Sequence, residues 1–128
     1  MQITEFAFVC YAVTDLARAR NFYEKVLGFT PGKTWTDGTK GWIEYEVGPH
    51  TLAITNMADN WPPSPHGAAV GFEVADFDVA IAELTAAGVK FVIPPCDTPV
   101  CRMCIISDPD GSPICIHQRA PVKLPNVG

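Results

Sequence analysis

The stretch VTDLARARNFYEKVLGF, residues 13–29, decides how this chain is expected to fold. Asp15 can accept hydrogen bonds from the free backbone N–H groups of a first helical turn. Gly28 suits the left-handed residue that follows a helix. Between them, apolar side chains recur at three- and four-residue spacing, which predicts a helix with one buried face. The apolar positions are Leu16, Ala19, Phe22, Tyr23, Val26 and Leu27.

The same pattern returns in GAAVGFEVADFDVAIAELTAAGVKF, residues 67–91. Asp76 and Gly88 take the places of the first aspartate and glycine, and the stripe between them is Phe77, Ala80, Ile81, Leu84 and Ala87. A strand precedes each helix, and alternating segments separated by turns predict three strands after it. These strands are expected at 31–36, 42–47 and 51–56, and again at 90–94, 100–107 and 112–118. The sequence therefore predicts a βαβββ unit that occurs twice.

Length and composition favour one compact domain, and the repeated βαβββ pattern places it in the α+β class. The chain has 128 residues, of which 48% are hydrophobic and 18% are charged, and this is ordinary for a folded protein. We expect a single domain over residues 1–120, with module one at about 3–59, a proline-rich linker at 60–67 and module two at about 68–119. The segment 120–128 lacks periodicity and is expected to be a flexible tail.

Charge and patterning also bear on partners and location. The net charge is −5, and basic residues are scattered, so nucleic acid is not an expected partner. No apolar run reaches membrane-spanning length, and the start MQITEFAFVCYAV alternates like a strand and lacks the basic residues of a secretory signal. We therefore expect a cytoplasmic protein, outside the membrane, whose five cysteines are reduced thiols.

Two motifs carry a resemblance to a known family. Asp-Leu-x-x-Ala-x-x-Phe-Tyr-x-x-x-Leu-Gly-Phe occupies residues 15–29, and Asp-Pro-Asp-Gly occupies 108–111 within SDPDGSPICIHQ. With them the sequence resembles the vicinal oxygen chelate superfamily, the glyoxalase/bleomycin resistance protein/dioxygenase group, from Glu5 to about Gln118. The resemblance implies two βαβββ modules that form a half-open, eight-stranded, barrel-like cleft, the glyoxalase/bleomycin resistance/dihydroxybiphenyl dioxygenase fold. It also implies a homodimer.

Members of this superfamily that hold a metal take its ligands from four strand positions. Carried onto this sequence, those positions are Phe8, Ala53, Ala69 and Cys115. Three of them have no donor atom, whereas a divalent ion needs three or four N, O or S ligands. We therefore expect no cofactor at the standard positions. A displaced site for a divalent metal such as zinc is the alternative, with ligands drawn from Cys10, Glu73, Cys115 and His117.

The thiols suggest two further kinds of chemistry. Cys101 and Cys104 form a C-x-x-C pair, but they lie in a β-rich run where residues three apart point to opposite faces, so we expect a structural role. Cys115 and His117 share one face of the last predicted strand, opposite its two isoleucines. A nucleophile–base pair of these two residues is possible in principle, although their Cβ atoms would lie about 7 Å apart.

The remaining cues indicate a binding cleft. Trp35, Trp42 and Trp61 offer flat surfaces for stacking planar or cationic groups, or they pack ordinarily. Glu73 is either surface-facing or a polar group of the cleft, and His117 is the polar cleft residue that we favour most. The ligand-binding cleft is expected to contain Phe8, Cys10, Trp35, Trp42, Ala53, Ala69, Glu73, Cys115 and His117.

Three functions remain open on these grounds. The first is a small-molecule-binding protein that resembles the glyoxalase and bleomycin-resistance proteins and lacks their standard metal site. The second is a metal-dependent lyase or dioxygenase that uses displaced ligands, with Cys115, His117 and Glu73 as candidates. The third is a non-catalytic scaffold for a protein partner. The sequence assigns no catalytic residue, because fold alone does not settle function.

Overall fold

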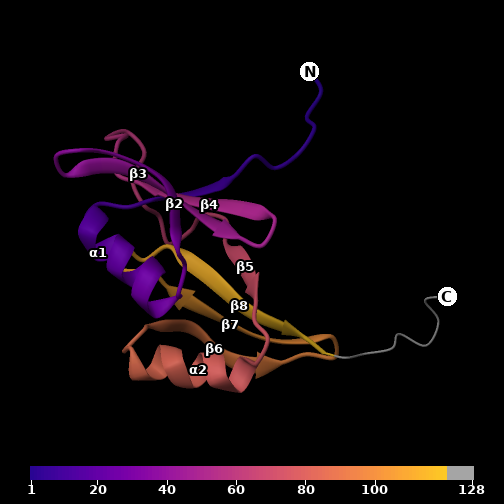
Figure 1. The fold of residues 1–128 in the computed structure, drawn as a ribbon. Coiled ribbons are helices and arrows are strands. Elements are labelled where there is room, and N and C mark those ends of the chain that lie inside the picture. The colour runs from indigo at the N-terminus through magenta and orange to yellow at the C-terminus, as the bar shows by residue number, and fades with distance from the viewer. Residues whose placement is uncertain (121–128) are drawn as a thin grey trace. The chain divides into compact units, whose positions relative to one another are not determined.

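A computed structural model describes residues 1–120 of the chain (Figure 1). The predicted tail at 120–128 lies, from residue 121, outside the described residues. The strands form two four-stranded sheets. Along the chain the elements are β1 (Val9–Ala12), α1 (Leu16–Arg20), η1 (Asn21–Val26), β2 (Pro31–Asp37), β3 (Lys40–Val47), β4 (His50–Thr55), β5 (Val70–Glu73), α2 (Phe77–Ala86), β6 (Phe91–Asp97), β7 (Cys101–Ser107) and β8 (Pro113–Arg119). The predicted α+β class with two βαβββ modules is confirmed.

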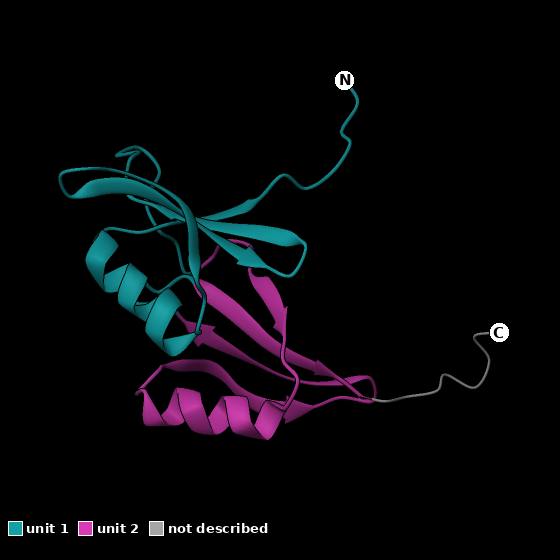
Figure 2. Cartoon of the chain, in the orientation of Figure 1, with its two compact units in different colours: residues 1–65, 108–112 teal, residues 66–107, 113–128 magenta. Residues whose placement is uncertain are grey.

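The chain divides into two compact units (Figure 2). The first comprises residues 1–65 and 108–112, and the second comprises 66–107 and the chain from 113 onward. The turn at 108–112 therefore packs with the first unit, although the strands on either side of it belong to the second.

The sheet of the first unit has the strand order β1-β4-β3-β2. β1 runs parallel to β4, and the other neighbours are antiparallel. The pairing of β1 with β4 begins where Val9 meets Leu52. The strand therefore begins at Val9, later than the alternation at the N-terminus indicates, because no strand in the described chain pairs with the residues before it.

One face of this sheet packs against the first helix. Tyr11, Ile43, Tyr45 and Ile54 are buried there, and the ring of Tyr23 from the helix lies 6.1 Å from that of Tyr45. Burial of such large apolar side chains is the main stabilising term in a unit of this size.

The first helix differs from the single α-helix that the periodicity predicts. Asp15 caps it as expected, accepting a hydrogen bond from the N–H of Arg18 at 3.0 Å. After α1 the backbone continues as the π-helix η1, in which the N–H of Leu27 donates to the carbonyl of Phe22. A π-helical turn holds more residues than an α-helical turn, and the adjacent side chains of Phe22 and Tyr23 are both buried.

The second unit repeats the plan with strand order β5-β8-β7-β6 and a regular helix (Figure 1). Asp76 caps α2 by accepting from the N–H of Val79 at 3.1 Å. The helix ends at Ala86, and Gly88 then takes the expected positive φ of 72°. Ala87, predicted on the buried stripe, is exposed because it is the C-cap and no longer part of the helix.

Candidate functional site

The face of the first sheet that lies opposite the helix carries the predicted ligand-binding residues of this unit. Strand pairing places Cys10 beside Ala53 and Ala53 beside Glu44. Trp35 pairs with Trp42 across β2 and β3. Because neighbours in register share a sheet face, these five side chains belong to one surface.

Three aromatic side chains on this surface form what we call the stacking face: Phe8, Trp35 and Trp42. The ring of Phe8 packs edge-on against that of Trp42, with 5.2 Å between the centroids. The indole N–H of Trp42 donates to Oε2 of Glu44 at 2.9 Å, which fixes the ring beside a carboxylate. Phe8 is 48% exposed and Trp35 is 52% exposed, so flat ring surface is open to solvent.

The other residues considered for the cleft are either buried, fully or in part, or do not belong to the stacking face. Ala53 is fully buried, and Ala69 is exposed in the segment before β5. Trp61 is exposed in the linker and does not belong to the stacking face. Burial raises the pKa of the Cys10 thiol to about 11, so this cysteine keeps its proton at neutral pH and is a poor nucleophile.

The second sheet brings Glu73 and His117 together. They are register partners on the parallel strands β5 and β8, and Oε1 of Glu73 is hydrogen-bonded to Nδ1 of His117. Oε2 of Glu73 accepts from the backbone N–H of Arg119 at 2.7 Å. The N–H of Arg119 and the imidazole of His117 hold the pKa of Glu73 below its ordinary value, so the carboxylate is charged at neutral pH.

Burial and strand register determine the chemistry open to the cysteines of β7 and β8. Cys101 pairs with Arg119 and Cys104 pairs with Ile116, an odd number of residues apart, so the two thiols lie on opposite faces of β7. The prediction of opposite faces is confirmed. Burial raises the pKa of Cys104 to about 11 and also raises that of Cys115. A thiol that keeps its proton does not serve as the nucleophile of a Cys115–His117 pair.

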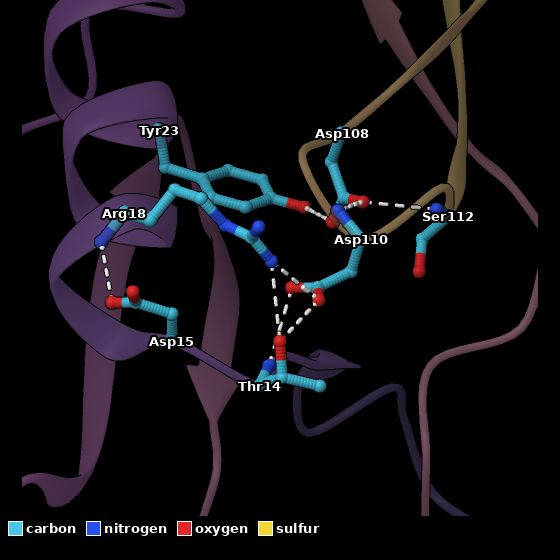
Figure 3. A network of polar contacts seen from close by, with 7 residues as sticks. All are labelled: Thr14, Asp15, Arg18, Tyr23, Asp108, Asp110 and Ser112. Atoms are coloured by element: carbon cyan, nitrogen blue, oxygen red, sulfur yellow. Dashed lines mark hydrogen bonds and ion pairs between the residues drawn. The ribbon is translucent and has the colours of Figure 1, made fainter.

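Sequence reasoning missed a polar network at the Asp-Pro-Asp-Gly turn (Figure 3). Asp108 is buried, and its carboxylate accepts from the Tyr23 hydroxyl at 2.9 Å and from the N–H groups of Asp110 and Ser112. Asp110 accepts from the Thr14 hydroxyl at 2.6 Å and pairs with the Arg18 guanidinium at 2.8 Å. The network attaches the turn to the first helix. The turn motif was visible in the sequence, but nothing in it indicated these partners.

Comparison with known proteins agrees with this architecture. The sequence model of the Glyoxalase/Bleomycin resistance protein/Dioxygenase superfamily matches residues 5–116. The chain belongs to this superfamily. No curated protein sequence matches the chain.

Solved structures from the superfamily share the fold. TnmS3, described as an antibiotic binding protein from Streptomyces sp. CB03234, is 25% identical over 94% of this chain and 99% of its own, with a TM-score of 0.76. A glyoxylase/bleomycin resistance protein/dioxygenase domain from Frankia sp. EAN1pec is 17% identical over 95% and 96%, with a TM-score of 0.75. A glyoxalase family protein from Enterococcus faecalis is 21% identical over 91% and 99%, with a TM-score of 0.70.

The donor set does not fit the metal that the resemblance to this superfamily implies. Phe8, Ala53 and Ala69 offer no ligand atom, which leaves Cys115 as the one donor among the four positions. Within residues 1–120, no group of three or more His, Cys, Asp or Glu side chains could hold a metal ion. No helix in that part of the chain is long and apolar enough to cross a membrane.

Proposed function

We propose that the chain binds a planar aromatic small molecule on the stacking face. The exposure of Phe8 and Trp35 beside Trp42, on one sheet surface, carries the proposal. Flat aromatic side chains lose little conformational entropy on binding and offer a large apolar contact area. A ligand ring that covers them removes this area from water, which is a favourable term for binding.

Glu44 adds a preference for charge. Its carboxylate lies beside the Trp42 ring, to which it is hydrogen-bonded, and a carboxylate has acceptor sites beyond the one that the indole uses. A ligand with a positive charge or an N–H group at its edge gains a hydrogen bond there while its ring stacks on Trp42. The proposed ligand is therefore a flat aromatic molecule, cationic in preference to anionic.

The relative TnmS3, described as an antibiotic binding protein and similar to nearly the whole chain, supports binding of a small molecule. The other solved relatives named above support the fold alone. We propose binding rather than a metal-dependent lyase or dioxygenase reaction, because the thiols and the alanine and phenylalanine positions do not make a set of ligands. Elemental analysis of protein purified without chelator tests that choice, and about one equivalent of bound metal per chain would overturn it.

The binding experiment uses proflavine, a flat cationic dye, as the probe and Trp fluorescence as the readout. The chain has three tryptophans, so Trp→Phe variants at residues 35, 42 and 61 assign the quenching. We expect saturable quenching that loses amplitude in Trp35→Phe and Trp42→Phe and keeps it in Trp61→Phe. Salt at about 0.15 M suppresses unspecific attraction of the dye to the acidic surface.

Affinity gives the second readout. Trp42→Ala removes a stacking partner and is expected to weaken binding about tenfold, since such contacts contribute about 1–1.5 kcal/mol. Trp61→Ala is the matched control and should leave the dissociation constant unchanged. Equal weakening by both variants, or no saturable quenching with this dye or with a panel of neutral planar compounds, would refute the proposal.

A further inference from the structure

We propose that Glu73 and His117 form a proton-accepting site for the acidic hydroxyl group of a phenol or enol. The inference goes beyond the proposed function, which concerns the stacking face of the first sheet, and requires only that a small molecule reaches this face of the second sheet. It names a chemical group that such a ligand carries.

The strands present the two side chains on the face that the helix does not cover. Arg102 and Gln118 are register partners on the helix side of the sheet. The Arg102 guanidinium lies 4.8 Å from the Phe77 ring of α2, and the Gln118 amide oxygen accepts from the Phe77 N–H. His117 is adjacent to Gln118 on β8 and therefore points to the opposite face, together with its partner Glu73.

Glu73 is held by both of its oxygens, one on His117 and the other on the Arg119 N–H. A charged carboxylate and a ring nitrogen cannot share a hydrogen bond without a proton between them. Since the pKa of Glu73 is lowered, that proton resides on Nδ1 of His117. When the imidazole is neutral, this is its one ring proton, and Nε2 then bears the lone pair.

Nε2 is where a ligand would bind. Within residues 1–120, no hydrogen bond is recorded for Nε2, and the His117 side chain is 29% exposed. Its register partner on β7 is Met103, a side chain that offers only a weak acceptor. The Cys115 thiol on the same strand face donates weakly to a backbone carbonyl at 3.9 Å. An oriented acceptor among weakly polar neighbours thus remains open to a donor from outside.

The other charged and titratable groups of this face favour an anionic oxygen at Nε2. The Arg119 side chain follows His117 on the same strand face, and its charge is close enough to contribute to the lowered pKa of Glu73. The remaining titratable groups on this face come from each strand of the sheet: Glu73 of β5, Cys115 of β8, Cys101 of β7 and Cys96 of β6. Glu73 is the one carboxylate among them, and it is already used by the imidazole and the Arg119 N–H.

The chemistry is a proton transfer in which the O–H bond of the ligand breaks and an N–H bond forms at Nε2, with no oxidation or reduction. The ligand O–H donates to Nε2, and its proton moves onto that nitrogen when the hydroxyl is acidic enough. The products are a phenolate or enolate oxygen and an imidazolium that lies between this oxygen and the Glu73 carboxylate. An aliphatic alcohol is too weak an acid to make this transfer. A carboxylic acid has already lost its proton at neutral pH and brings none to a neutral imidazole.

The test compares 4-nitrophenol with 4-nitroanisole, its methyl ether, by equilibrium dialysis and visible absorbance with the full chain. Near neutral pH, where free 4-nitrophenol is a mixture of phenol and phenolate, we expect the protein-bound compound to show a larger phenolate fraction than the free compound. 4-Nitroanisole has no proton to give and reports on ring contacts alone.

His117→Asn is the decisive variant. The Asn amide N–H takes the place of Nδ1 and keeps the bond to Glu73, while Nε2 is removed. We expect 4-nitrophenol to bind about tenfold more weakly and without the larger phenolate fraction, because a charge-assisted hydrogen bond is lost. 4-Nitroanisole should bind the variant and wild type equally. His50→Asn, which alters an exposed histidine of the first sheet, should change neither compound.

Glu73→Gln gives a second readout, since the amide keeps an oxygen for the Arg119 N–H but removes the charge that stabilises the imidazolium. We expect a smaller phenolate fraction than in wild type. The proposal is overturned if 4-nitrophenol binds with no larger phenolate fraction than the free compound, binds His117→Asn equally well, or does not bind. If proflavine still quenches Trp fluorescence as expected in any of these cases, the proposed function at the stacking face stands, and the two failures are thereby distinguished.

Discussion

Replacement of Asp108 by asparagine should be tolerated, although the carboxylate accepts three hydrogen bonds. One comes from the Tyr23 hydroxyl at 2.9 Å, and the others come from the N–H groups of Asp110 and Ser112 at 3.0 and 2.9 Å. The Asn oxygen can accept from both N–H groups, and its amide N–H can donate to the Tyr23 oxygen, which is also an acceptor. Each buried group then keeps a hydrogen-bond partner, and the Tyr23 hydroxyl changes from donor to acceptor.

The magnitudes follow from what each variant leaves unpaired. Asp108→Asn should change the free energy of unfolding at pH 7 by less than about 1 kcal/mol, since all three hydrogen bonds have a neutral counterpart. Tyr23→Phe leaves one carboxylate oxygen without its donor in a site that is 4% exposed, and this should cost about 1–3 kcal/mol. Asp108→Ala leaves three donors unpaired and should cost about 3 kcal/mol or more.

The pH dependence gives an independent check. Burial raises the pKa of Asp108 above its ordinary value of 3.8. The hydrogen bonds from the Tyr23 hydroxyl and the Ser112 N–H lower the pKa, but burial has the larger effect. A group whose pKa is higher in the folded than in the unfolded state contributes stability that is present below the unfolded pKa and is lost as the pH rises through the folded pKa. The stability of Asp108→Asn relative to wild type should therefore increase from acid to neutral pH.

Urea unfolding followed by Trp fluorescence over this pH range measures each variant against wild type. Asp15→Asn is the matched control, because asparagine caps a helix as well as aspartate does, so its difference from wild type should be small. If Asp108→Asn were as destabilising as Asp108→Ala, or if its relative stability fell with rising pH, the charge itself would hold the turn and the reasoning would fail.

Three further outcomes are expected. Asp110→Ala should lower the free energy of unfolding, measured with urea, by about 1–3 kcal/mol, because the Asp110 side chain is 5% exposed and accepts several hydrogen bonds. Arg18→Ala should lower it by less than about 1 kcal/mol, because the Arg18 side chain is 50% exposed. Gly41→Ala should lower the melting temperature, since a Cβ there would lie 2.8 Å from a backbone oxygen and from a leucine methyl, while Gly32→Ala, with 3.7 Å to its nearest neighbour, should change it little. N-ethylmaleimide should label the exposed Cys96 before the four other thiols, as peptide mass spectrometry would show.

Local signals in the sequence predicted most of the secondary structure. The caps at Asp15 and Asp76 and the glycines that close the helices each depend on neighbours a few residues away, so a short stretch specifies them. The π-helix at Asn21–Val26 was not predicted, because its apolar spacing also fits an α-helix. What distinguishes the two conformations is the packing of the helix against its surroundings, which a short window does not contain.

The candidate site was predictable in its faces but not in its pairs. Alternation along β8 was enough to place His117 on the face opposite the isoleucines, and the resemblance placed Phe8 in the expected cleft. The partner of His117 depends instead on the register between the parallel strands β5 and β8, which lie more than forty residues apart in the chain. On sequence alone Glu73 was equally a surface residue and a cleft residue. The register makes it the group that orients the imidazole, and this turns an isolated histidine into a site whose chemistry can be tested.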